Sequence, residues 1–269
     1  MFRIGCEDRA YDLHRPRGCT VLTIEVEYWP GNEFGLWLPE TLYVGDEIVW
    51  CNWKGDAHQC WDHDGDVLRW TKSLEMFRIV STLAPDPDNS CIWYRHSFEN
   101  TCDHVLSDVN SQTCFHLVNA PQFVSIRGER IWACLDGRWR TTDGVPRAQS
   151  PDPRRVSFLR EGVRSERTVI PVTSFPSAVM PEQASHPLMI AEMFGGTGSL
   201  GIACKDCKKL FNNNDSILRC LHSEPFPIES LEPGGRWDQE GILLFCEGDH
   251  QAILEHFEAI VPARWRAVD

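Results

Sequence analysis

Hydrophobic and polar residues alternate along several short segments of this chain, and such alternation is typical of half-buried β-strands. Residues 21–29 end at Pro30-Gly31 and alternate apolar and charged positions in their later part. Residues 47–51 form a second strand-like run after a turn at Gly45-Asp46. Further strands are predicted at residues 91–95, 114–118, 123–127, 130–135, 168–173, 199–204, 216–221 and 242–246, with residues 127–129 as a hairpin turn.

Two other segments carry apolar residues at helical spacing. From Asp66, a possible N-cap, apolar residues recur every three or four positions until Pro85 and Pro87 end the pattern. These positions are Val67, Leu68, Thr71, Leu74, Phe77, Ile79 and Val80. Residues 250–260 predict a second helix, capped by Asp249, whose apolar stripe contains Ile253 and Phe257. Mixed strands with two main helices predict an α+β fold.

The segment at residues 138–167 interrupts these patterns. It is rich in arginine and proline and poor in large apolar residues, which is typical of a flexible linker or loop insertion. We therefore divide the chain into an N-terminal α+β part at residues 1–137, a linker at 138–167 and a C-terminal part at 168–269. The alternative is that the two outer parts form one continuous domain.

Composition narrows the possible compartments and partners. The net charge of −13 argues against a specific nucleic-acid surface, which would need clustered lysine and arginine. No apolar run is long enough to span a membrane, and the N-terminus becomes charged too early for a signal peptide. We therefore expect an intracellular protein, in which twelve cysteines are thiols or metal ligands. If the chain were exported, disulfides would be the alternative.

A Cys-x-x-Cys motif gives the sharpest chemical signal. Cys204 and Cys207 have the spacing of a zinc knuckle, and Cys220 with His222 would complete a tetrahedral Zn²⁺ site. Four protein ligands leave no open position, so the predicted zinc is structural. Two unmetallated thiols at Cys204 and Cys207 are the simpler alternative.

Other cysteines and histidines compete for the same role. Cys246 and His250 could replace Cys220 and His222 as the second ligand pair. A weaker second metal site is formed by Cys51, His58, Cys60 and His63, although nearby aspartates equally suggest a solvated acidic turn. A third group, at His96, Cys102 and His104, we interpret as ordinary core or surface residues.

Motifs of known catalytic sites are missing from the sequence. It has no nucleophile elbow, no Walker-type phosphate loop and no His-Glu-x-x-His helix. The glycine-rich run at residues 195–198 lacks the Lys-Ser/Thr pair that holds phosphates. We therefore predict that the protein is not an enzyme.

Several short segments, in this order, resemble the 34 kDa protein family of adenovirus early region 4, the product of open reading frame six. They lie roughly between residues 18 and 222 and include Ile92-Trp93-Tyr94-Arg95 and the Cys204/Cys207 knuckle. The other segments are residues 18–21, 67–70, 76–80, 123–131, 135–137, 169–175 and 218–220.

The resemblance implies a viral early protein of the host nucleus and cytoplasm that acts as a substrate adaptor. Such proteins recruit a host cullin–elongin ubiquitin ligase to host targets such as p53, often with a viral early region 1B protein. They also promote late viral mRNA export. Leu200, Ile202 and Cys204 match the family's Leu-x-x-x-Cys elongin box and would bind the ligase. The alternative is an inhibitory binder of a host protein that recruits no ligase.

Overall fold

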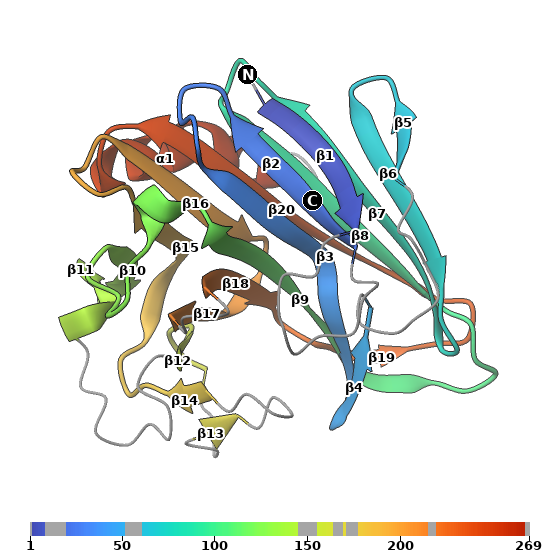
Figure 1. Ribbon diagram of the computed structural model, residues 1–269. Helices are drawn as coiled ribbons and strands as arrows, with labels where there is room; N and C mark the ends of the chain where they lie inside the picture. Colours follow the sequence, from blue (N-terminus) through green and yellow to red (C-terminus); the bar gives the residue numbers. More distant parts are fainter. Residues whose placement is uncertain are drawn as a thin grey trace.

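Nearly all regular structure in the described residues is β-sheet. The computed structural model describes residues 2–8, 20–51, 61–144, 155–163, 169–170, 177–214 and 219–266. Its strands form two large sheets that face one another as a sandwich (Figure 1). None of the described helices has the length and apolar character needed to span a membrane.

The first sheet, called sheet A here, is antiparallel apart from one short parallel pair between β12 and β14. Its main path runs β1-β2-β3-β9-β18-β17-β12-β14-β13, with β4 paired to β3 and β19 paired to β9. The strands are β1 (Phe2–Asp8), β2 (Thr20–Val26), β3 (Glu33–Val44), β4 (Glu47–Trp50), β9 (Leu106–Asn119), β12 (Arg155–Leu159), β13 (Val169–Ile170), β14 (Ser177–Val179), β17 (Cys207–Asn214), β18 (Arg219–Pro225) and β19 (Ile228–Leu231).

The second sheet, sheet B, runs in the order β11-β10-β15-β16-β20-β8-β7-β6-β5. Its strands are β5 (Asp62–Asp64), β6 (Val67–Ser73), β7 (Phe77–Asp86), β8 (Cys91–Asn100), β10 (Ile131–Leu135), β11 (Arg138–Thr141), β15 (Ala184–Glu192), β16 (Gly198–Cys204) and β20 (Arg236–Glu247). Two 3₁₀ turns, η1 (Pro121–Phe123) and η2 (Thr142–Gly144), complete the connections described.

An aromatic cluster joins the two sheets across the main core. Phe245 of β20 packs against Phe34 of β3 and Phe115 of β9, with ring centroids 6.0 and 6.1 Å apart. Trp29 and Phe123 extend the cluster, 4.9 Å from one another. Because strand side chains alternate between faces, each strand contributes every second residue to this core.

The one described α-helix, α1 (His250–Arg266), covers the outer face of sheet B. Its buried residues Ile253, Phe257 and Val261 pack against β15, β16 and β20. The sequence prediction of this helix is confirmed, including its cap: Asp249 Oδ1 accepts the backbone N–H of Gln251 at 3.0 Å. The helix continues six residues beyond the predicted end, through Pro262.

The predicted α+β class is wrong. The expected helix after Asp66 is the hairpin of β6 and β7. Its apolar positions fit a period of two as well as a helical one, because Leu68 and Trp70, then Phe77, Ile79 and Leu83, are buried on alternate residues. Pairing of β7 with β8 decides between the two patterns.

A second local prediction also fails. Residues 123–127 are not a strand, since η1 ends at Phe123 and irregular chain leads to β10. The predicted hairpin turn at residues 127–129 therefore joins no pair of strands, and β10 pairs instead with β11 and β15.

Both sheets draw strands from the two predicted outer parts of the chain. Sheet A pairs β9 with β18, and sheet B pairs β8 with β20. Within the predicted linker, residues 138–141 and 155–159 form β11 and β12, and β12 is buried throughout. Residues 145–154 and 164–167 lie outside the described part.

A buried histidine spans the gap between the sheets. His96 of β8 is fully buried, with Nδ1 3.0 Å from Ser81 Oγ of β7 and Nε2 3.3 Å from Thr113 Oγ1 of β9. Burial lowers the pKa of His96 from 6.5 to about 3, because the charged ring would lose its hydration.

We expect this histidine to make stability fall with acid. Between pH 6.5 and about 3 the unfolded chain binds a proton at this residue that the folded chain does not. The free energy of unfolding should therefore decrease as pH falls, by at most about 1.4 kcal/mol per pH unit. Urea unfolding at pH 7 and 5 should show a smaller pH effect in His96→Gln than in wild type. His104→Gln, at an exposed position, is the control, and an unchanged pH effect in His96→Gln would contradict the prediction.

Candidate metal centre

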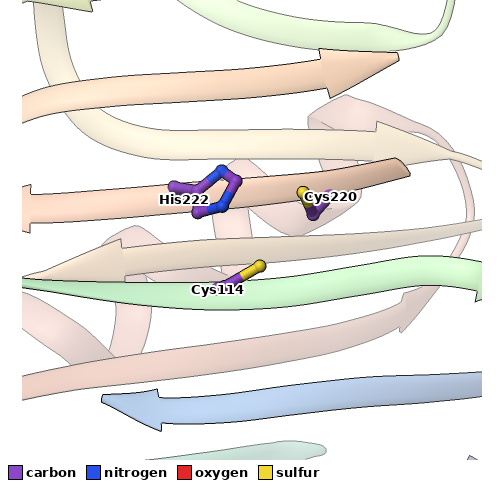
Figure 2. A group of neighbouring side chains, drawn as sticks. All are labelled: Cys114, Cys220 and His222. Atoms are coloured by element: carbon purple, nitrogen blue, oxygen red, sulfur yellow. The ribbon is translucent and has the colours of Figure 1, made fainter. Parts of the chain in front are cut away.

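A compact group of potential metal ligands lies on the outer face of sheet A. One ligand atom each from Cys114, Cys220 and His222 lies within 4.8 Å of the other two, and all three residues are buried. In the part of the chain that the structure describes, no other set of three or more such residues meets this criterion. Figure 2 shows Cys114 on one strand and Cys220 with His222 on the neighbouring strand.

Strand register explains why these residues meet. Cys114 on β9 is directly opposite His222 on β18, and Cys220 is directly opposite His116. Each strand therefore presents a Cys-x-His pair, and the period of two places cysteine and histidine on the same face. Phe115 and Leu221, between the members of the pairs, point into the core between the sheets. The result is a square of two cysteines and two histidines on adjacent antiparallel strands.

Aromatic rings enclose this square. The ring of Phe211 stacks on His222 with centroids 4.5 Å apart, and Trp37 meets His116 edge-on at 4.2 Å. Trp37, Cys114 and Cys220 form a small buried cluster separate from the main core. Cys114 Sγ lies 3.3 Å from His116 Nε2, so both histidines border the sulfur atoms.

A buried carboxylate holds one of the two histidines. Glu40 Oε2 lies 3.3 Å from His222 Nε2 and also accepts a hydrogen bond of 2.7 Å from Gln112 Nε2. Glu40 falls in an irregularity of the β3–β9 register between Trp37 and Thr41, where a bulge redirects side chains. The other ring nitrogen of His222, Nδ1, is buried and has no hydrogen-bond partner in the described part of the chain.

Within this group, the surroundings favour a negatively charged thiolate at Cys220 and a positively charged imidazolium at His222. Burial alone would raise the pKa of Cys220, but its hydrogen bond with Cys114 and the charge on His222 outweigh burial and lower it to about 6. Burial would lower the pKa of His222, but Cys220 and Glu40 raise it to about 10. The pKa of Glu40 is lowered in spite of burial, chiefly by His222. A thiolate is thus stabilised before any metal binds.

The structure divides the four zinc ligands predicted from the sequence into two places. Cys204 and Cys207 face the core between the sheets at the β16–β17 turn, whereas Cys220 belongs to the outer cluster. Cys207 is opposite Pro225, three residues from His222, or about 10 Å along the strand. Burial, followed by the neighbouring Cys207, raises the pKa of Cys204 well above its usual value.

The alternative ligand pair, Cys246 and His250, also lies away from Cys204 and Cys207. Cys246 is opposite Ser199, five residues along β16 from Cys204, or about 16 Å. His250 stacks on Trp132 and its Nδ1 lies 2.8 Å from Glu192 Oε1. Of the weaker second site, Cys51 is buried and His63 is exposed on β5, while His58 and Cys60 lie outside the described residues.

Sequence reasoning missed Cys114, His116 and Glu40. A signal for the first two was present, because Cys114-Phe115-His116 repeats the Cys-x-His spacing of Cys220-Leu221-His222. That spacing has meaning only on a strand, where it places both ligands on one face. Glu40 had no such signal, since a bulge brings it to the site.

Comparisons with known proteins find no matching family and only solved structures of low similarity. No protein-family model and no curated protein matches the chain. A galactose mutarotase-like protein from Clostridium acetobutylicum is 11% identical, with 91% of this chain and 99% of that chain covered and a TM-score of 0.46. A putative aldose 1-epimerase from Escherichia coli K12 is 10% identical, with 92% and 100% covered and a TM-score of 0.45. A Synechocystis protein is 11% identical, with 80% and 78% covered and a TM-score of 0.44.

These findings overturn the adenoviral interpretation. No family model or curated protein supports the adenoviral resemblance, and none of the three structures above is named as viral, so the family resemblance is wrong. The viral adaptor function, its inhibitory alternative and the elongin, cullin, early region 1B and p53 partners fall with it. Nuclear and cytoplasmic location stays only a prediction. The prediction of no enzymatic activity is also at odds with the neighbours' names, but at this similarity their activities stay with them.

The proposed elongin box fails on structural grounds as well. Leu200, Ile202 and Cys204 alternate along β16 and are all completely buried in the core between the sheets. The residues between them face α1, where a Cβ on Gly201 would lie 2.8 Å from Leu188 Cδ1. These side chains therefore hold the two sheets together and cannot dock a partner.

Truncation of Leu200 should destabilise the protein. Leu200→Ala removes a fully buried side chain from a packed core and should lower the free energy of unfolding by about 2–5 kcal/mol. Phe194→Ala, at a position 76% exposed, should change it by less than about 0.5 kcal/mol. Urea denaturation of both variants measures the difference; similar small losses in both would show that Leu200 is not a core residue.

Proposed function

We propose that this protein is a zinc-binding β-sandwich whose metal ties β9 to β18 through Cys114, Cys220 and His222. His116 lies outside that group, but its Nε2 is 3.3 Å from Cys114 Sγ, and we propose it as the fourth ligand. The observation that carries the proposal is the buried group of three ligand atoms within 4.8 Å of one another. Thiolate and imidazole are the donors that structural zinc sites use.

The distances suit a small contraction around a metal ion. With Zn–S bonds of about 2.3 Å and Zn–N bonds of about 2.0 Å, neighbouring donors of a tetrahedron lie about 3.3–3.8 Å apart. The three atoms need to approach by about 1 Å at most from their present separation. Side-chain rotation without movement of the strands can supply a shift of this size.

The surroundings of His222 support the same assignment. Its buried Nδ1 lacks a partner among the described residues, while Nε2 contacts Glu40. A metal-bound histidine commonly donates its second N–H to a carboxylate, which fixes the ring and increases its basicity. Zinc at Nδ1 would give Nε2–H and Glu40 that role, and binding would release the extra proton of His222.

Burial argues against nucleophilic catalysis by the same residues. Cys220 and His222 together resemble a thiolate–imidazolium pair, but they are only 4% and 3% exposed. A nucleophile needs a substrate within bonding reach, and a closed set of four ligands leaves no coordination position open. The metal would therefore stabilise the sandwich, and binding of other molecules must occur elsewhere.

Elemental analysis of the purified protein tests the proposal. Wild type should contain about one zinc per chain, whereas Cys114→Ser, Cys220→Ser and His222→Asn should contain little, because each removes a ligand. Cobalt substitution should give the visible spectrum of a tetrahedral thiolate site in wild type and lose its thiolate band in the cysteine variants. Thermal unfolding with and without a chelator should show that zinc stabilises wild type alone.

The variant Cys204→Ser distinguishes this zinc site from the one that the sequence predicted at Cys204 and Cys207. Cys204→Ser removes a buried cysteine outside the group and should retain zinc, provided that circular dichroism shows it folded. Loss of zinc from Cys204→Ser together with retention in Cys114→Ser would place the metal at the knuckle and overturn the proposal. Zinc-free wild type from zinc-supplemented cultures would overturn both sites.

A further inference from the structure

A pocket lies where the β16–β17 turn, the end of β12 and the C-terminal part of α1 meet. Its volume is about 580 Å³, within the range of small-molecule sites. Charged residues follow β12 and occupy the turn, and aromatic residues come from the segment before β19 and from α1. The lining residues include Arg160, Glu161, Asp206, Phe226 and Trp265.

Arg160 is the cation in this pocket that has no counter-ion. Among the described residues its guanidinium makes no ion pair, and its Nη1 is buried without a hydrogen-bond partner. Its charge acts on Cys134 and His186, and its backbone N–H donates to Lys208 O at 2.8 Å. An unpaired, partly buried guanidinium carries a desolvation cost that a bound anion would remove, and arginine suits the planar carboxylate.

A second donor at the pocket wall also lacks an acceptor. Trp265 Nε1 is buried and makes no hydrogen bond to any described residue. Its ring meets Phe257 edge-on at 5.8 Å, which holds it at the end of α1. Binding through either N–H requires that Trp265 or Arg160 turn toward the open volume.

Two carboxylates at the same pocket restrict what can enter. Glu161 and Asp206 form no ion pair or side-chain hydrogen bond with other described residues. They would repel a dianion such as a phosphate monoester, but they can accept hydrogen bonds from hydroxyl groups. The half-exposed ring of Phe226, 46% exposed, gives the pocket an apolar side on which a carbon skeleton can pack.

We propose that this pocket binds a small monoanionic hydroxy acid of monosaccharide size, with its carboxylate on Arg160. Trp265 then supplies a second donor, Glu161 and Asp206 accept from the hydroxyl groups, and Phe226 covers the carbon skeleton. None of these residues belongs to the proposed zinc site, so the two proposals stand or fall separately.

Titration calorimetry of the full chain with D-glucuronate tests this assignment. Glucuronate should bind with a Kd on the order of 1 mM, as expected for a ligand of this size. D-glucose lacks the carboxylate, cyclohexanecarboxylate lacks the hydroxyl groups and glucose 6-phosphate carries a dianion. Each should bind at least about tenfold more weakly, because the first two lose a predicted contact and Glu161 and Asp206 repel the dianion of the third.

Variants locate the binding to this pocket. Arg160→Gln should weaken glucuronate binding at least about tenfold, and Trp265→Phe, which keeps an aromatic ring but loses the N–H, about threefold or more. Arg78→Gln makes the same charge change on β7, where the arginine is 51% exposed, and should bind as wild type does.

Three results would overturn the proposal. They are no detectable glucuronate binding by wild type, equal binding of glucose, and unchanged binding in Arg160→Gln. Equal melting temperatures of Arg160→Gln and wild type exclude a folding defect. If that variant unfolds, Trp265→Phe and Asp206→Asn carry the test, and unchanged binding in both overturns the assignment.

Discussion

The pairing of β9 with its neighbours is the constraint on which the rest of this structure depends. The strand runs from Leu106 to Asn119, lies inside sheet A and pairs with β3, β18 and β19. Its alternate side chains serve opposite faces, because successive residues of a strand point to opposite sides of the sheet. Val109, Phe115 and Leu117 enter the core between the sheets. Cys114 and His116 then necessarily face outward, where β18 presents the second Cys-x-His pair.

A slip of one residue between β9 and β18 would destroy both features together. It would turn Phe115 out of the aromatic core and move Cys114 away from His222. Burial of the apolar residues fixes the register between β9 and β18, and this register positions the candidate ligands. A metal bound there would in turn stabilise the same register. Such agreement between packing and site chemistry is what a uniquely specified fold requires.

The two proposed sites differ in what the fold allows them to do. The cysteine–histidine square is covered, and its donors surround one another, so it suits an ion that stays in the protein. The pocket beside α1 is open and contains groups whose hydrogen-bonding capacity is unfilled within the described residues. A buried guanidinium without an ion-pair or hydrogen-bond partner costs free energy. The position of Arg160 beside an open volume is therefore more consistent with ligand binding than with a role in stability.

The sequence by itself determined those elements that depend on interactions between residues close together in the chain. Asp249 and the stripe of Ile253 and Phe257 specified α1, because a side-chain cap and a period of 3.6 act within a few turns of chain. Short apolar runs likewise predicted nine of the twenty described strands, among them β2, β8 and β20. Cys220 and His222 were predicted as a ligand pair from their spacing alone, and the structure places both in one buried group.

Only the tertiary structure decided between patterns that the sequence left equal. Residues 67–83 satisfy helical and strand periods alike, and pairing with β8 selects the strand. Leu200 matched a docking motif, yet the opposite sheet buries it. The partner of Cys220 and His222 is Cys114, about a hundred residues earlier in the chain, instead of the nearby Cys204 and Cys207. The physical reason is that strand pairing joins distant segments, and the face on which a side chain lies is fixed only when that register forms.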